Sequence, residues 1–283
     1  SPSHENPQNF VRNGQAVGPL KGYSCQLVMD EALGWLKKQQ AKDPEQPFFL
    51  YVAFHEPHEP VASPKEIVNQ YDGVAKNHNQ AQYFANVTNL DAAVGKLTKA
   101  LEAMKLDENT LVIFTSDNGP ETLLRYGPRS GRSFGVAGPL RGMKLWTTEA
   151  GFRVAGIMRW PARIKAGQVS DRPVSALDFL PTFCELAGSQ PPKDLALDGA
   201  NFLPALEDKP IIRKKPLVWV YYSALNNRRV AMRDGQWKVL AKLSIGKLKT
   251  IDSRNADQVK GATLSEFQVF DLSKDVGEKE DLA

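Results

Sequence analysis

The sequence has few cysteines, no long apolar run and no large excess of charge of either sign. Its 283 residues include two cysteines, Cys25 and Cys184, which lie far apart and are too few for a disulfide scaffold. No apolar run approaches the roughly 18 residues of a membrane-spanning helix, and no basic–apolar–small pattern opens the chain, so neither a span nor a secretion signal is predicted. The net charge of +4 is too small to indicate a nucleic-acid partner.

The composition is that of a globular chain with one strongly basic segment. Hydrophobic residues make up 42% of the chain and charged residues 24%, which excludes a wholly disordered protein. From residue 125 to residue 165 the only acidic residue is Glu149. The basic residues there are Arg125, Arg129, Arg132, Arg141, Lys144, Arg153, Arg159, Arg163 and Lys165. Such a segment is either a solvated face or the lining of a pocket for an anion such as phosphate, sulfate or carboxylate.

Apolar strands and amphipathic helices alternate in the first two thirds of the chain. Helical spacing predicts a helix over residues 23–40 and a long helix over residues 83–104 with one apolar stripe that includes Val87, Leu90 and Val94. Continuous apolar runs at residues 48–54 and 110–114 predict strands, the first of them buried on both faces. Strand, helix and strand in this order predict a parallel crossover unit, and therefore an α/β fold with a mostly parallel sheet sandwiched between helices.

The pattern changes after Pro216. Short strands are expected at residues 217–222, 229–233, 237–241 and 267–272, and Asp234-Gly235 is typical of a hairpin turn. These strands predict a smaller C-terminal α+β subdomain with antiparallel pairing. We therefore expect one α/β domain over residues 1–210 and a second, smaller unit over residues 211–283.

Polar residues follow both predicted strands of the crossover unit. His58 lies in a Pro-rich loop after the first strand, and Asp117 and Asn118 directly follow the second. Ligands of open α/β sheets bind outside the carboxyl ends of the strands, so we expect both loops at one edge of the sheet. A carboxylate beside an amide oxygen suits calcium or magnesium. An Asp-Asn-Gly turn is also common without any ligand, and two residues alone favour that simpler interpretation.

Lys144 is the candidate anion-binding residue of the basic segment. Lysines are usually solvated, but Gly142 nearby would let the backbone and the ammonium group approach an anion closely. Taken with the two polar loops, the pattern describes a divalent cation with an anionic ligand that Lys144 and His58 hold.

Several stretches resemble the C-terminal part of a type I, formylglycine-dependent sulfatase of the alkaline phosphatase superfamily. They are PFFLYVAFHEPHEP, TLVIFTSDNGPE, GPLRGMKLWTTEAGFRVAGIMRWP and the closing FQVFDLSKDVGEKEDLA. Their order and spacing run through nearly the whole chain and are similar to the arylsulfatase A and N-acetylgalactosamine-6-sulfatase branch. The resemblance implies an alkaline phosphatase-like fold and hydrolysis of sulfate esters.

The resemblance also implies roles for single residues. Asp117 and Asn118 match two calcium ligands, Lys144 matches a lysine that holds a sulfate oxygen, and His58 matches a histidine near the leaving oxygen. Arg141, in the same motif as Lys144, is expected to contact the substrate. One departure is visible: EAGFR at residues 149–153 stands where the family has Glu-Gly-Gly-x-Arg, so Ala150 replaces a glycine.

The family's nucleophile is absent from these 283 residues. It is a formylglycine made from the first residue of Cys/Ser-x-Pro-x-Arg, but Gln-Leu-Val-Met follows Cys25 and Glu-Leu-Ala-Gly follows Cys184. We expect Cys184 to be a buried apolar residue that is not converted. The paired aspartates that complete the calcium site are expected in a missing N-terminal segment, so the chain alone is expected to be inactive.

Two other functions stay open at this stage. One is a phosphonate monoester hydrolase or phosphodiesterase of the same superfamily, and the other is a non-catalytic fragment that binds sulfated glycans. The expected partners are a sulfate ester or sulfated glycan, with the missing N-terminal segment or a second copy of the chain, and no nucleic acid or membrane. The resemblance implies a periplasmic, secreted or lysosomal location.

Overall fold

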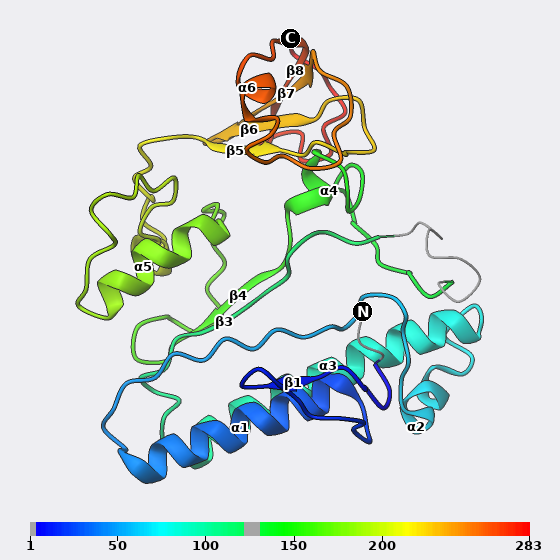
Figure 1. The fold of residues 1–283 in the computed structure, drawn as a ribbon, viewed down its shortest axis with the longest axis vertical. Coiled ribbons are helices and arrows are strands. Elements are labelled where there is room, and N and C mark those ends of the chain that lie inside the picture. The colour runs from blue at the N-terminus through cyan, green and yellow to red at the C-terminus, as the bar shows by residue number, and fades with distance from the viewer. Residues whose placement is uncertain (1–3, 122–130) are drawn as a thin grey trace. The chain divides into compact units, whose positions relative to one another are not determined.

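The computed structural model describes residues 4–121 and 131–283, which form two compact units (Figure 1). The first unit holds residues up to 108 together with residues 121–135, and the second holds residues 109–120 and 136–283. Two of the basic residues, Arg125 and Arg129, lie outside the described residues. Within the described part, no helix is long and apolar enough to cross a membrane.

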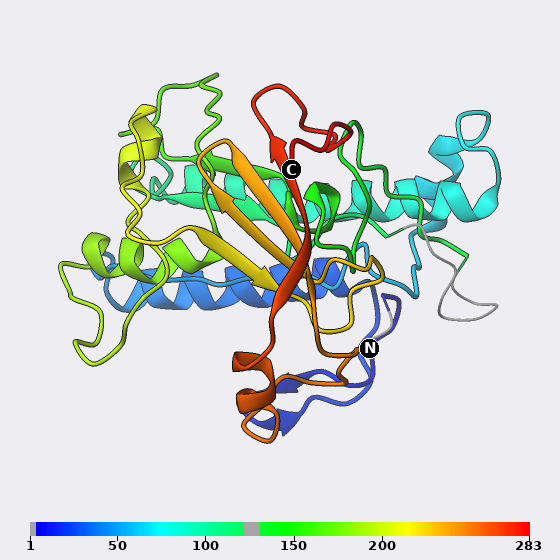
Figure 2. The same ribbon diagram turned by 90° about the horizontal axis from the view of Figure 1, so that it is seen from above.

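Two long helices lie side by side in the first unit, α1 (Ser24–Lys42) and α3 (His78–Ala103) (Figures 1 and 2). Both were predicted from helical spacing. Their shared core contains Cys25, Met29, Leu90 and Ala93. The smaller elements of this unit are β1 (Val11–Arg12), β2 (Gln15–Ala16), α2 (Lys65–Val68) and the short 3-10 helix η1 (Asn69–Tyr71).

The buried face of α3 is rotated from the predicted stripe. The helix begins after Asn77, whose side-chain oxygen accepts a hydrogen bond from the Gln80 N–H at 3.0 Å. Val87 was expected on the apolar stripe but is 43% exposed, whereas Asn86 and Asn89 are buried. The Asn86 amide has buried partners, since it donates to the Ala62 carbonyl at 3.0 Å. A hydrogen-bonded polar side chain can therefore be buried on α3 while the apolar side chain of Val87 is exposed.

The expected buried strand at residues 48–54 is wrong in its burial and pairing. The segment joins no ladder among the described residues, and its side chains alternate between the two faces. Val52 and Phe54 pack on the core of α1 and α3, whereas Phe49 and Tyr51 are 69% and 80% exposed. An extended segment packed on one side only shows this period of two, which a continuous apolar composition conceals.

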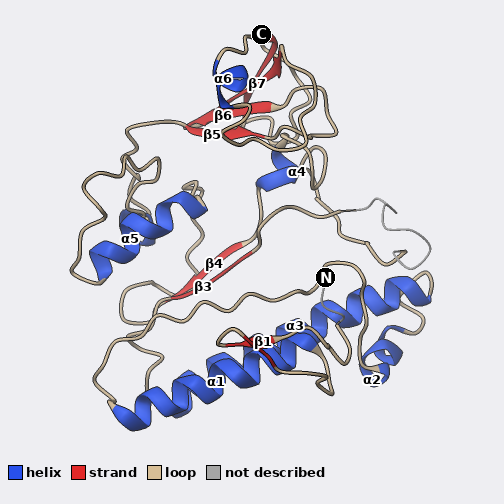
Figure 3. Ribbon diagram, in the orientation of Figure 1, coloured by secondary structure: helices blue, strands red, loops and turns tan. Residues whose placement is uncertain are grey.

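The second unit contains a two-stranded ladder. It pairs β3 (Val112–Thr115) with β4 (Gly156–Arg159) (Figure 3). A strand was predicted at residues 110–114, but the pairing of β3 with β4 is antiparallel, as is every ladder among the described residues. A parallel crossover between residues 48–54 and 110–114 is therefore not among the described pairings. The mixture of helices and sheets has the expected α/β character.

Helix α5 (Phe179–Leu186) covers an apolar cluster of the second unit and follows the 3-10 helix η2 (Ala176–Asp178). Its cluster includes Trp160, Phe202 and Leu206, and the 3-10 helix η3 (Leu203–Glu207) contributes to it. Cys184 was expected to be buried, but it is only half-buried. The α5 side chain that is buried is Thr182, which accepts a hydrogen bond from the Phe202 N–H at 2.9 Å.

The C-terminal sheet has the predicted antiparallel order. It consists of β5 (Leu217–Val220), β6 (Val230–Asp234), β7 (Trp237–Leu243) and β8 (Leu264–Asp271), with the short helix α6 (Ala256–Lys260) before the last strand. The β6–β7 turn lies at Asp234-Gly235, as predicted, and Gly235 has the φ of +55° that favours glycine there. The division at residue 210 stays a prediction.

Candidate functional site

The turn after β3 presents oxygen atoms at its surface. Asp117 is exposed, and the Ser116 hydroxyl donates to its Oδ1 at 3.4 Å. Asn118 donates from Nδ2 to the Gly119 carbonyl at 2.9 Å, and no hydrogen bond among the described residues reaches its Oδ1. The turn therefore offers a carboxylate and an amide oxygen, the donor types that calcium prefers.

Close backbone packing holds this turn against the short helix α4 (Glu149–Phe152). The Gly119 N–H donates to the Gly151 carbonyl at 3.0 Å. A Cβ at Gly119 would overlap the carbonyl oxygen of Ala150, so only glycine allows this approach. Sequence reasoning noted Gly119 only as part of the turn and missed its packing role.

The segment that carries Lys144 lies beside the same turn. The Lys144 N–H donates to the Pro120 carbonyl at 2.8 Å, which brings the lysine backbone next to the Asp117-Asn118 turn. Leu145 has a φ of +72°, a left-handed conformation that costs a leucine free energy. Its carbonyl accepts from the Leu225 N–H at 2.9 Å, and this bond helps to maintain the unusual conformation.

Gly142 is required in this segment for a reason other than the expected one. Its φ of +85° favours glycine, and a Cβ there would overlap the Thr148 hydroxyl. That hydroxyl donates to the Arg141 carbonyl at 2.7 Å. Gly142 thus lets the two ends of the segment close on each other.

The departure at Ala150 is compatible with the packing. Ala150 is fully buried, and its N–H donates to the Arg141 carbonyl at 3.0 Å. A Cβ at the neighbouring Gly151, by contrast, would overlap the Trp146 carbonyl. Alanine therefore stands at the position that has room for a methyl group, and glycine is kept where the backbones meet.

A buried cluster of charged side chains, which we call the Glu149 cluster, includes the first residue of α4 and joins this helix to β7 and to the end of the chain. It consists of Glu149, Lys238, Glu278, Arg153 and Arg233. The Lys238 Nζ lies 2.9 Å from Glu149 Oε1 and 2.8 Å from Glu278 Oε1, and all three side chains are fully buried. Arg153 and Arg233 lie 3.4 and 3.7 Å from Glu149 Oε2. Burial raises the pKa of Glu278, and Lys238 opposes this effect.

Sequence reasoning missed the Glu149 cluster. Its only signal was that Glu149 is the single acidic residue of the basic segment. Nothing local links Glu149 to Lys238 on β7 or to Glu278 near the end of the chain, because both partners are distant in sequence.

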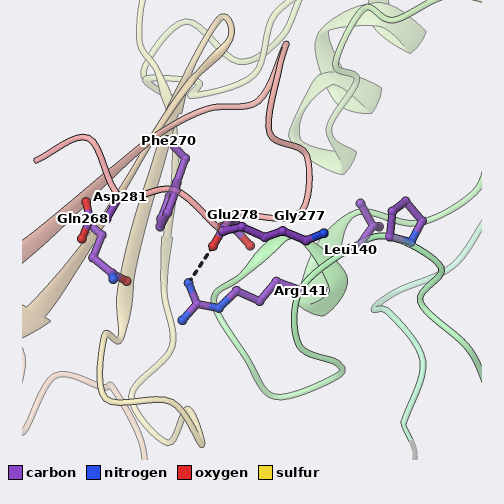
Figure 4. Close-up of a pocket in the computed structure, with 9 residues that line it drawn as sticks. Leu140, Arg141, Gln268, Phe270, Gly277, Glu278 and Asp281 are labelled. Carbon is purple, nitrogen blue, oxygen red and sulfur yellow. Dashed lines mark hydrogen bonds between the residues drawn. The ribbon is translucent and has the colours of Figure 1, made fainter.

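Arg141 lines a pocket of about 600 Å³ in the second unit (Figure 4). The pocket residues are Pro139, Leu140, Arg141, Gln268, Phe270, Gly277, Glu278, Lys279 and Asp281. The Arg141 Nη1 donates to the Glu278 carbonyl at 3.1 Å, the bond drawn as a dashed line in Figure 4. Part of the guanidinium group therefore holds the C-terminal segment.

His58 belongs to the first unit and has its own surroundings there. Its Nδ1 lies 2.7 Å from the Glu59 carbonyl, which orients the imidazole. The His55 ring lies 5.6 Å from the His58 ring and 4.6 Å from that of His4. Burial, followed by the two neighbouring histidines, lowers the pKa of His55 to about 4, so His55 is neutral at physiological pH.

The structure places four of the five predicted site residues, namely Asp117, Asn118, Lys144 and Arg141, in the second unit, where a backbone hydrogen bond joins the Lys144 segment to the Asp117-Asn118 turn. That His58 shares their site stays a prediction. In the part of the chain that the structure describes, no three His, Cys, Asp or Glu side chains gather as a metal site. Asp117 and Asn118 could supply two of the about six to eight oxygens that calcium takes.

Comparison with known families matches the chain to two family models. One is Sulfatase, over residues 2–189, and the other is N-sulphoglucosamine sulphohydrolase, C-terminal, over residues 143–255. The first covers more than half of the chain.

Similar curated proteins carry sulfatase names. N-acetylgalactosamine-6-sulfatase of Canis lupus familiaris is 38% identical over 191 residues, which cover 66% of this chain and 34% of the relative. Uncharacterized sulfatase YdeN of Escherichia coli (strain K12) is 33% identical and covers 73% of this chain and 35% of the relative. The chain spans about a third of the length of these relatives.

Solved structures show the same fold. The crystal structure of Ps i-CgsB is 31% identical with a TM-score of 0.74, over 95% of this chain and 52% of that one. Phosphonate Monoester Hydrolase of Agrobacterium radiobacter is 19% identical with a TM-score of 0.53, over all of this chain and 60% of that one, which shows similarity of fold alone. The chain belongs to the sulfatase family of the alkaline phosphatase superfamily.

Proposed function

We propose that these residues form part of an enzyme that hydrolyses sulfate esters. The observation that carries the proposal is the 2.8 Å hydrogen bond from the Lys144 N–H to the Pro120 carbonyl. It joins the backbone of the segment that carries Lys144 to the turn that offers the oxygens of Asp117 and Asn118. A cation site with a lysine on the adjoining segment would suit a sulfate ester, because its oxygens carry negative charge.

Each residue has a distinct proposed task. Asp117 and Asn118 hold calcium, which when bound would stabilise negative charge on the sulfate oxygens. Lys144 neutralises another sulfate oxygen, and Arg141 contacts the substrate nearby. His58, which Glu59 orients, donates a proton or a hydrogen bond to the leaving oxygen.

The nucleophile of this reaction is proposed to come from outside the 283 residues. Neither cysteine lies in Cys/Ser-x-Pro-x-Arg, and Cys25 is buried in the core of α1 and α3. Formylglycine, together with further calcium ligands, would then belong to a segment that these residues do not include. The chain alone is expected to hydrolyse sulfate esters negligibly.

The alternatives have weaker support. A phosphonate monoester hydrolase shares the fold at 19% identity, whereas the family model and the relatives above 30% identity are sulfatases. One solved neighbour, Ps i-CgsB, is described in complex with k-i-k-neocarrahexaose, which suggests a sulfated glycan as the substrate class here. A periplasmic, secreted or lysosomal location would suit such substrates.

The test compares the 283-residue chain with the same chain joined to a segment that carries a converted Cys-x-Pro-x-Arg. Turnover of a chromogenic aryl sulfate with calcium is expected only from the joined form. Lys144→Ala should lower its kcat by about 10²–10³-fold, the usual cost of losing one charge-stabilising donor. Lys165→Ala, an exposed lysine of the same basic segment, is the control.

Three outcomes would contradict the proposal. Unchanged kcat in Lys144→Ala would remove that residue from the site. Faster turnover of a phosphonate monoester than of the aryl sulfate would favour the other hydrolase. Robust turnover by the 283 residues alone would reveal a nucleophile within them.

The calcium role of Asp117 has a separate test. Asp117→Asn in the joined form should need a higher calcium concentration for half-maximal activity, by about tenfold, because affinity depends on ligand charge. The control is Asp91→Asn, an exposed aspartate on α3. Equal calcium dependence in both variants would remove Asp117 from the metal site.

A further inference from the structure

We propose that Glu278, near the end of the chain, is a positioning residue that holds the Lys144 loop in its shape. We define the Lys144 loop as residues 139–151. The proposal rests on the proposed role of Lys144, and it assigns a task to a residue that touches neither the substrate nor the reacting atoms.

Glu278 contacts both ends of the Lys144 loop. Its Oε2 accepts from the Glu149 N–H at 2.8 Å at one end, and its carbonyl accepts from Arg141 Nη1 at 3.1 Å at the other. Its Oε1 lies 2.8 Å from Lys238 Nζ, which fixes the carboxylate to β7. Figure 4 shows Glu278 and Arg141 as neighbours in the pocket lining, joined by the hydrogen bond from Arg141 Nη1. Glu278 therefore adds a buried contact to each end of a loop whose ends also meet directly, through the bonds from the Ala150 N–H and the Thr148 hydroxyl to the Arg141 carbonyl.

The turn around Glu278 is built to present this carboxylate. Glu278 has a φ of +51°, a left-handed conformation that residues other than glycine keep only when their surroundings enforce it. The Asp275 carboxylate accepts from the N–H groups of Lys279 and Glu280 at 2.6 and 2.8 Å. Gly277 lets the turn approach the loop, since a Cβ there would lie 3.1 Å from the Pro139 carbonyl.

The contacts of Glu278 restrict the backbone conformation of the Lys144 loop. The loop contains two left-handed residues, Gly142 and Leu145, on either side of Lys144. Such a segment has more extended alternatives that would relieve the strain at Leu145. The contacts of Glu278 with Arg141 and Glu149 disfavour these extended conformations. The backbone of Lys144 therefore stays beside Pro120 and the Asp117-Asn118 turn.

A matched pair of variants separates the effect of side-chain length at position 278 from an effect on the stability of the whole protein. Glu278→Gln and Glu278→Asn both remove the charge, but only glutamine has the length to reach the Glu149 N–H. Asparagine tolerates the left-handed φ, so its effect does not come from backbone strain. Glu280→Gln, on an exposed neighbour in the same turn, is the control.

The first measurement is hydrogen–deuterium exchange of the 283-residue chain. Glu278→Asn should raise exchange in peptides covering residues 139–151 by about fivefold or more, because a buried N–H loses its acceptor. Exchange in Glu278→Gln should lie between that of Glu278→Asn and that of the wild type. Exchange in strands β5 and β6 should be unchanged in both variants. Wild-type exchange in both variants, or an equal increase throughout the second unit, would overturn the proposal.

The second measurement uses the joined form and the aryl sulfate. Glu278→Asn should raise KM by about tenfold, and Glu278→Gln should restore most of the loss. A purely structural defect lowers the amount of active enzyme and leaves KM unchanged, and that result would overturn the proposal. If the wild-type joined form shows no sulfatase activity, the proposed function fails, while the exchange experiment still decides the role of Glu278.

Discussion

Close backbone approaches at single glycines shape the turn that carries Asp117. Gly119 lies against Ala150, and Gly151 lies against Trp146, with no room for a Cβ at either glycine. Two glycines on facing segments let the β3 turn and α4 share a backbone hydrogen bond at 3.0 Å. At the residue scale, the geometry of the candidate site depends on glycines, which have no side chain, as much as on the polar residues.

We expect Gly119→Ala to destabilise the protein by about 1–3 kcal/mol, because the new methyl group forces two backbones apart. Gly156→Ala is the control, since that glycine lies on β4 with nothing within 4 Å of the added Cβ and no positive φ. Denaturant unfolding of both variants measures the free energies. Equal stability of the two variants would contradict the packing argument.

The two cysteines should differ in reactivity. Burial raises the pKa of the Cys25 thiol to about 12, and the neighbouring Glu56 adds to the effect, so Cys25 should resist alkylation in the native state. Cys184 is half-buried and should be alkylated first. Peptide mass spectrometry after brief iodoacetamide treatment identifies the site, with both thiols labelled in denaturant as the control. An aldehyde at position 184 would refute its assignment as an ordinary cysteine.

At the scale of elements, β7 supports α4 through Lys238. The Lys238 Nζ pairs with two carboxylates and lies 4.4 Å from the centre of the Phe152 ring. Phe152 in turn stacks on Trp219 of β5 at 4.1 Å. Helix α4 is only four residues long, so these contacts, rather than helix propensity, stabilise it.

Lys238→Met should lower the free energy of unfolding by about 3–5 kcal/mol, because it leaves Glu149 and Glu278 buried without their shared cation. Lys242→Met on the same strand is the matched control. Lys242 is 46% exposed and pairs with the exposed Glu266, so its loss should cost less than about 1 kcal/mol. Similar losses from both variants would show that the Glu149 cluster contributes little.

At the scale of the whole molecule, residues 48–54 present an apolar edge. Phe49 and Tyr51 are 69% and 80% exposed on an extended segment that joins no ladder among the described residues. Exposed apolar side chains beside unpaired strand-like backbone promote association between chains.

We expect the 283-residue chain to self-associate, and the double variant Phe49→Lys with Tyr51→Lys to reduce this association, since lysine protects exposed edges. Sedimentation velocity over a range of protein concentrations measures the effect. Val169→Lys, at an exposed valine elsewhere, is the control. A wild-type chain that stays monomeric at every concentration would contradict the expectation.

Much of the fold could be predicted because the relevant signals are local. Helical spacing gave α1 and α3, and short strands with an Asp-Gly turn gave the C-terminal sheet. The antiparallel pairing of β3 with β4 could not be predicted, because strand direction depends on where a distant segment returns. The same limit applied to Val87 and to Cys184, whose exposure is decided by neighbours that are far away in sequence.

The sequence by itself determined the family and most helices and strands, since these depend on residue types at fixed spacings. The four candidate site residues of the second unit stay a prediction. Only the tertiary structure decided the pairing of β3, the approach of Gly119 to Ala150 and the burial of Glu149 with Lys238 and Glu278. The physical reason is that buried charges and backbone contacts gain their free energy from partners brought together by folding. Residues 149, 238 and 278 become neighbours only when the C-terminal sheet packs against α4.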